Sequence, residues 1–101
     1  MQLSDLKILL DTIGVSVAFH AFKKPQALPY IVFITPGADN MAADGKVYYS
    51  TPRVQVELYT AAKDTVLEGK VESALSSFFW QKDEGYLDDE QMYMVTYQFT
   101  L

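Results

Sequence analysis

The sequence predicts an α+β fold in which two helices pack on a mainly antiparallel sheet of about four to five strands. Two observations predict it. Apolar residues recur at helical spacing in two segments, one near the N-terminus and one past the middle of the chain. Elsewhere, apolar and polar residues alternate in short runs, as in strands with one buried face. The expected order is α-β-β-(β)-β-α-β, and the 101 residues are expected to form one domain over residues 1–101.

The first helix is expected over residues 4–13. Ser4 is a suitable N-cap, and Gly14 can take the left-handed conformation that ends many helices. The apolar residues of this segment fall at i, i+3, i+4 and i+7, which places them on one face of a helix packed on a core. They are Leu6, Leu9, Leu10 and Ile13.

Three segments are expected to form the first strands of the sheet. Residues 15–22 are β-branched and aromatic, and residues 30–34 are apolar on both faces, which indicates a central strand covered on both sides. In the third segment, Val54, Val56 and Leu58 alternate with polar residues and share the face expected to be buried.

A polar and turn-rich stretch, residues 35–46, follows the second strand. About a dozen residues without secondary structure are unusual in so small a domain, and such a stretch is typical of a functional loop. We therefore expect a long mobile loop that contacts a partner, followed by a short strand at residues 47–49. The residues expected to make the contact are Gly37, Asp39, Asn40, Met41 and Asp44.

The second helix is expected over residues 63–79. Gly69 lies inside it and costs about 1 kcal/mol relative to alanine, so we expect close packing against the sheet there. An acidic turn at residues 83–90 is expected to lead into a last strand at residues 91–101. The apolar face of the helix is expected to contain Leu67, Val71, Ala74, Leu75 and Phe78, and that of the last strand Tyr93, Val95, Tyr97, Phe99 and Leu101.

Five residues of this second helical segment are candidates for an interface. Asp64, Glu68 and Glu72 recur every four residues and are expected on a face away from the apolar one. Phe79 and Trp80 lie at the end of the segment and are expected to be partly exposed. Tryptophan is enriched among the residues that anchor protein–protein interfaces.

The sequence predicts no enzyme and no catalytic, cofactor-binding or metal-binding residue. The chain contains no cysteine, and nothing marks a nucleophile beside its one histidine, His20. No phosphate-binding glycine loop, zinc motif or nucleophile elbow is present. The acidic residues between positions 83 and 90 lack the fixed ligand spacing of calcium loops.

Charge and hydropathy exclude two classes of partner. The net charge of −5 and the pI near 4.6 argue against a nucleic-acid-binding surface, which needs clustered lysine and arginine. The sequence also lacks the run of about 18 apolar residues that a membrane-spanning helix requires. We therefore expect a soluble protein that binds neither a specific nucleic-acid sequence nor a membrane.

Several short segments keep a characteristic order and spacing over residues 3–100. They are Leu28–Val32, Ala43–Tyr48, Val54–Thr60 with Lys63-Asp64, Lys70–Glu72, and Tyr86-Leu87 with Glu90, Tyr93 and Val95–Tyr97. In this order they resemble tail-to-head joining (tail completion) proteins of long-tailed, siphovirus-type phages and of Gram-positive prophages. None of the segments is a catalytic signature, so the resemblance rests on their order in a chain of this length.

The resemblance implies a structural, non-enzymatic component of the virion at the tail–head junction, assembled in the cytoplasm of a bacterial host. The partners it implies are further copies of the chain in a ring, typically a hexamer, the tail tube protein and the head connector. Two alternatives remain at this point. One is the tail terminator protein of the same virion, and the other is a small cytoplasmic protein-binding module unrelated to virions.

Overall fold

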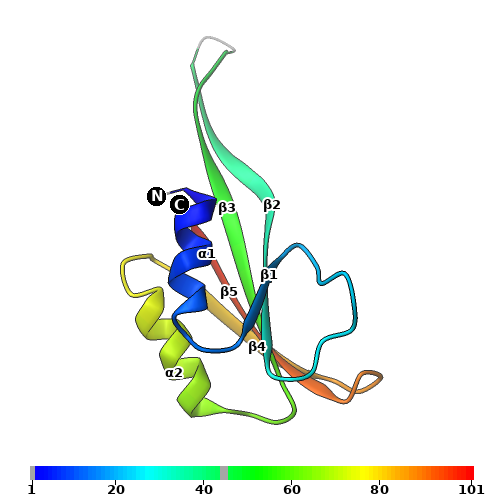
Figure 1. Cartoon of the computed structure of the whole chain (residues 1–101). Helices are drawn as coiled ribbons and strands as arrows, with labels where there is room; N and C mark the ends of the chain where they lie inside the picture. The colour runs from blue at the N-terminus through cyan, green and yellow to red at the C-terminus, as the bar shows by residue number, and fades with distance from the viewer. Residues whose placement is uncertain (1, 44–45) are drawn as a thin grey trace.

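Five strands form a single sheet, and two helices lie on one of its faces (Figure 1). The computed structural model describes residues 2–43 and 46–101, with side-chain surroundings for residues 2–37 and 52–101. The predicted α+β class is confirmed. The elements are α1 Leu3–Asp11, β1 Ser16–Phe19, β2 Tyr30–Ala43, β3 Lys46–Thr60, α2 Thr65–Ala74, β4 Gln81–Leu87 and β5 Met92–Thr100.

The strand order across the sheet is β1-β2-β3-β5-β4. β1 runs parallel to β2, and every other neighbouring pair is antiparallel. β1 and β4 are therefore the two edge strands of the sheet. The parallel pair is short, because β1 ends at Phe19 opposite Phe33.

Two predicted irregular segments belong to strands instead. The prediction of a loop over residues 35–46 is wrong for residues 35–43 and for Lys46. β2 continues to Ala43 and pairs with β3, with shifts in register beside Ile34 and Met41. Backbone pairing with β3 overrides the weak β-propensity of this small, polar sequence. The strand expected at residues 47–49 is the beginning of β3.

The acidic turn expected over residues 83–90 is wrong for residues 83–87, which form most of β4. The chain turns only at residues 88–91, before β5. β4 is an edge strand, and charged residues are common on edges because they oppose pairing with other chains. The acidic composition therefore indicated an exposed strand as much as a turn.

The core lies between the sheet and the two helices, and the predicted apolar faces form it. Leu6 and Leu10 of α1, Val71 of α2 and Leu75, which caps the C-terminal end of α2, are fully buried. They pack with Val54, Val56 and Leu58 of β3 and with Val95, Tyr97 and Phe99 of β5. Burial of Ile31 and Phe33 on this face and of Val32 on the other agrees with a central position for β2.

Both helices are shorter than predicted. Gln2, not Ser4, is the N-cap of α1, and it forms a capping box with Asp5. α2 ends at Ala74, several residues before Phe79. Gly14 has a φ of 98°, which confirms the left-handed stop after α1. Neither helix of the described ranges is long and apolar enough to cross a membrane.

Candidate protein-interaction site

Beyond the body of the sheet, β2 and β3 pair only with each other. β1 leaves β2 after Phe33, and β5 meets β3 from Arg53 onward. Residues 34–43 and 46–52, here called the arm, therefore form a two-stranded ribbon that rises past α1 (Figure 1). At the root of the arm the Pro52 carbonyl accepts a hydrogen bond from the Leu101 N–H at 3.1 Å. Beyond it no third strand of the described residues pairs with the arm, so its outer edges present backbone N–H and C=O groups.

Four of the five residues predicted to contact a partner lie on one strand of the arm. Gly37 lies near its root opposite Arg53, and a Cβ added there would be 2.5 Å from the Arg53 guanidinium. Asp39, Asn40 and Met41 follow along β2. The fifth, Asp44, lies outside the described residues. The structure therefore places the first four on an extended ribbon instead of a loop.

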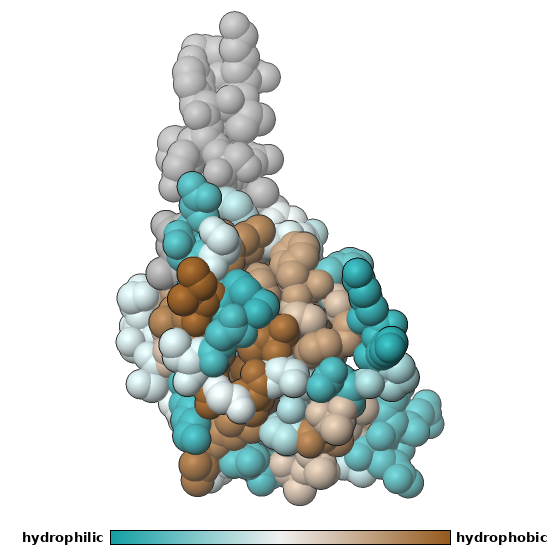
Figure 2. All heavy atoms as spheres, viewed as in Figure 1, coloured by the Kyte–Doolittle hydropathy of each residue, from teal (hydrophilic) through white to brown (hydrophobic). Residues whose placement is uncertain are grey.

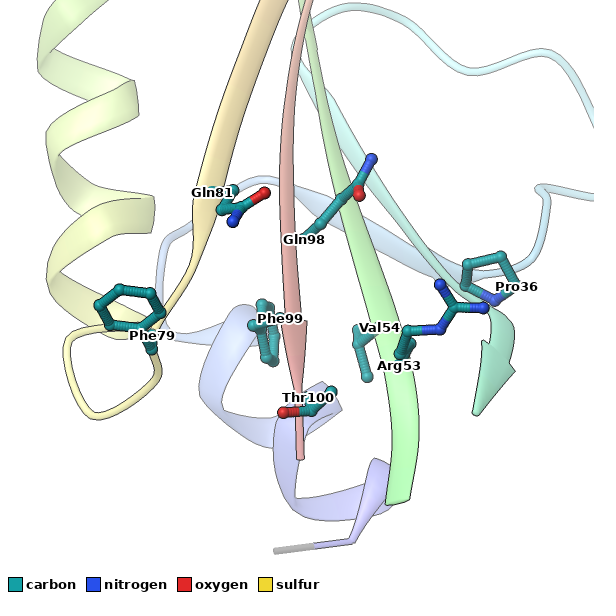
Figure 3. Close-up of a pocket in the computed structure, with 8 residues that line it drawn as sticks. All are labelled: Pro36, Arg53, Val54, Phe79, Gln81, Gln98, Phe99 and Thr100. Atoms are coloured by element: carbon teal, nitrogen blue, oxygen red, sulfur yellow. The ribbon is translucent and has the colours of Figure 1, made fainter. Parts of the chain in front are cut away.

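A pocket of about 290 Å³ lies at the root of the arm (Figure 3). We call it the arm-root pocket. Phe79 stands at its border and is 92% exposed, the most exposed large hydrophobic residue of the described chain. The pocket is lined by Pro36, Arg53, Val54, Phe79, Gln81, Gln98, Phe99 and Thr100.

The two residues beside Phe79 turn inward. Phe78 stacks on Phe99 with the ring centroids 4.7 Å apart, and Trp80 contacts Tyr97 edge-on at 5.3 Å. Both therefore support the core, and Trp80 is half-buried. Of the two aromatic interface candidates, only Phe79 has a side chain that is almost fully exposed.

The acidic interface candidates of α2 are engaged within the chain. Asp64 caps the helix, accepting a hydrogen bond from the Leu67 N–H at 3.0 Å. Glu68 is only 3% exposed, so its expected position on an outward face is wrong. Glu72 accepts hydrogen bonds at 2.8 Å from Lys82 Nζ and from the Tyr97 hydroxyl.

Two lysines hold these carboxylates against the edge of the sheet. Lys63 contacts Glu68 at 2.8 Å and Glu84 at 2.7 Å, and Lys82 contacts Glu68 and Glu72 at 2.8 Å each. The hydrogen bond from Lys82 lowers the pKa of Glu72, although burial opposes the shift. Burial opposes a charged Lys82 as well, but its hydrogen bonds to the two carboxylates raise its pKa overall.

A second pocket, of about 270 Å³, lies between α1 and β1 and is named the α1–β1 pocket. It is lined by Leu3, Ser4, Lys7, Phe19 and Phe33. Phe19, the last residue of β1, is 48% exposed, although its ring meets that of Phe33 edge-on. Figure 2 shows hydrophobic and hydrophilic surface side by side over α1, and hydrophobic surface between α1 and β1.

Sequence reasoning missed the α1–β1 pocket. Its residues come from three elements that are separated along the chain, so no local pattern joins them. The only available signal was Phe19, an aromatic residue at the end of a short strand. Gly69 differs from expectation too: it is exposed, and an added Cβ would meet nothing within 4 Å.

The features found on the described surface are the strand edges of the arm, the exposed side chain of Phe79 and the pockets. No group of three or more histidine, aspartate or glutamate side chains in the described residues is arranged to hold a metal ion. A comparison of the chain with protein-family models gives no match, and a comparison with curated proteins gives none. The arm, Phe79 and the α1–β1 pocket are thus the candidates for function.

Proposed function

We propose that the chain is a structural protein of a long-tailed phage or prophage that forms a ring at the top of the tail and joins the tail to the head. The order of short segments over residues 3–100 that resembles tail completion proteins supports this role. The observation that carries the proposal is the arm. The protein acts by assembly with other proteins and performs no chemical step.

The arm supports assembly because it is incomplete by itself. A two-stranded ribbon is at best marginally stable in water, and its outer edges here begin where β1 and β5 stop pairing. A strand from another subunit that pairs with either edge would satisfy these backbone groups, and strand addition of this kind is a common mode of recognition. Joining two virion parts needs a subunit that reaches beyond its own body, which the arm does.

The long axis of the molecule agrees with this role. Its principal extents are 49 × 28 × 25 Å, so the chain is nearly twice as long as it is wide. Subunits that stand side by side in a ring present such projections at one end of the ring. A closed ring needs heterologous contacts, in which one surface of a subunit meets a different surface of the next.

The decisive variant shortens the arm without disturbing the body. Ala38 and Pro52 are paired, so residues 39–51 can be replaced by Asn-Gly, the preferred two-residue hairpin turn. We expect the shortened protein to unfold at the temperature of the wild type. A phage that carries it should produce finished tails beside unjoined, DNA-filled heads in electron micrographs.

Each alternative has its own result. Overlong tails would indicate a tail terminator, and normal virions would contradict the proposal. Val66→Ala is the matched control, because Val66 is 72% exposed on α2, outside both the arm and the pocket at its root. A phage with this variant should assemble normally.

A further inference from the structure

We infer that copies of this chain associate head to tail, with Phe79 of one copy lying in the α1–β1 pocket of the next. This contact would be the one that closes the ring of the proposed function, and its biological setting rests on that proposal. It is carried by two apolar features of complementary form on opposite edges of the sheet.

The first feature is the isolated side chain of Phe79. It lies in the connection between α2 and β4, where Phe78 and Trp80 on either side pack inward. The body of the protein therefore has room for aromatic rings in this segment, yet Phe79 is 92% exposed. An exposed aromatic ring with anchored neighbours is well placed to enter a pocket on another molecule, as interface anchors do.

The second feature is the α1–β1 pocket. Its wall consists of Leu3, Phe19 and Phe33, with Ser4 and Lys7 completing the lining. At about 270 Å³ it has space for a phenyl ring, since a cavity of about 150 Å³ in another protein binds benzene. The rings of Phe19 and Phe33 already meet edge-on at 5.2 Å, and a third ring would extend this arrangement.

The strand order gives the contact its direction. Phe79 precedes β4, one edge of the sheet, and the α1–β1 pocket lies beside β1, the other edge. A protein with an apolar projection on one edge and a pocket on the other associates heterologously, which generates rings or filaments and not a two-fold dimer. Phe79 cannot reach the pocket of its own chain across the sheet.

The position of the arm agrees with a head-to-tail contact. Phe79 borders the arm-root pocket, and Phe33 of the α1–β1 pocket directly precedes the arm, so both features lie at the end of the body from which the arm rises. The open edge of β2 faces the pocket side and that of β3 faces the Phe79 side. The inferred contact therefore brings the β3 edge of one arm toward the β2 edge of the next.

The charges at the α1–β1 pocket are balanced within the chain. Lys7 is paired with Asp11 at 2.8 Å, and Asp5 lies in the first turn of α1, where its carboxylate accepts a hydrogen bond from the Gln2 N–H and offsets the positive pole of the helix. No unpaired charge of these residues therefore opposes the entry of an apolar ring, and the contact rests on its apolar surfaces and on the strand order.

The contact is expected to be weak in solution. One phenylalanine buries roughly 150–250 Å², whereas a stable interface needs about 800 Å² from each partner. Association should therefore depend on concentration, and a stable ring should form only where arm pairing or the tail adds further contacts. A folded free monomer is compatible with this arrangement.

Sedimentation velocity of the purified full chain, from about 10 μM to about 1 mM, tests the inference. The wild type should associate with rising concentration, and Phe79→Ala should weaken association about thirtyfold or more, the effect of losing an interface anchor. Val66→Ala, which also removes an exposed apolar side chain, should associate like the wild type. A wild type that is monomeric at about 1 mM, or an unchanged Phe79→Ala variant, would overturn the inference.

A second variant tests the pocket. Ser4 is exposed in the first turn of α1, where an added acid is favourable for the helix, so Ser4→Glu should fold while it places a charge in the pocket. Phe79→Ala retains an intact pocket, and Ser4→Glu retains an intact Phe79. Neither variant should associate alone, but their mixture should form dimers and nothing larger. Native mass spectrometry distinguishes these species, and a mixture that stays monomeric would refute the head-to-tail contact.

The proposed function and the inferred contact can fail separately. Mixed-variant dimers together with virions that lack the protein would leave the contact in place and reject the virion role. Joined virions that carry Phe79→Ala would reject the contact and leave the virion role in place.

Discussion

The buried carboxylate of Glu68 lies 2.8 Å from Lys82 Nζ and so ties α2 to the edge strand β4. The same oxygen, Oε1, is 2.8 Å from Lys63 Nζ, while Oε2 has no hydrogen-bond partner among the described residues. Lys82 also contacts Glu72, which accepts a hydrogen bond from the Tyr97 hydroxyl. The edge strand that follows Phe79 is thus fixed to the helix through charged groups.

Lys82→Met should lower the free energy of unfolding by about 2 kcal/mol. Removing one partner of a buried ion pair typically costs about 3–5 kcal/mol, and the partial exposure of Lys82 reduces that figure. Urea denaturation measures the change. Lys7→Met is the control, because Lys7 forms an exposed pair with Asp11 and should cost about 0.5 kcal/mol or less. Equal effects of the two variants would show that the Glu68 network adds no stability.

Acid should destabilise the protein through Glu72. Its pKa is lowered in the folded state, so its contribution is present above the ordinary value of 4.5 and is lost as the pH falls through the folded-state value. The difference in unfolding free energy between wild type and Glu72→Gln should therefore be about 0.5–1 kcal/mol at pH 7 and should vanish at low pH. Thermal unfolding of both proteins between pH 7 and pH 2.5 gives this difference. A constant difference would exclude the carboxylate as its source.

Periodicity carried most of the fold prediction. The apolar faces that contain Leu6, Val56 and Val71 could be recognised because each of these elements buries one face. Apolar residues then recur in the sequence with the period of the helix or strand. Periodicity failed where backbone pairing between strands, and not the burial of one face, determines the secondary structure. The arm is formed by backbone pairing between β2 and β3, and the acidic residues of β4 resembled a turn although an edge strand accepts them.

The candidate site could be predicted only in part. Phe79 was recognisable as an interface candidate because it is an aromatic residue at the end of a helix. Glu68 was misplaced because acidic residues every four positions are typical of a solvated face, and its lysine partners lie on other segments. The α1–β1 pocket joins Leu3 to Phe33, a contact between distant parts of the chain that local patterns do not contain.

Two glycine substitutions should have opposite effects. Gly14→Ala should destabilise the protein by about 1 kcal/mol, because a φ of 98° strains any residue with a Cβ. Gly69→Ala should stabilise it by up to about 1 kcal/mol, because Gly69 lies inside α2 and an added Cβ meets nothing within 4 Å. Thermal unfolding measures both changes. Destabilisation by Gly69→Ala would indicate that α2 packs more tightly at this position than the structure shows.

Substitutions of Asp64 separate a capping role from an interface role. Asp64 Oδ1 accepts the Leu67 N–H at 3.0 Å, so Asp64→Ala should lower the free energy of unfolding by about 1 kcal/mol. Asp64→Asn should retain most of the stability, because asparagine caps a helix about as well as aspartate does. Both variants should associate like the wild type in sedimentation experiments, since Asp64 lines neither the arm-root pocket nor the α1–β1 pocket. Weaker association of a fully stable Asp64→Asn variant would instead place the Asp64 carboxylate in a subunit contact.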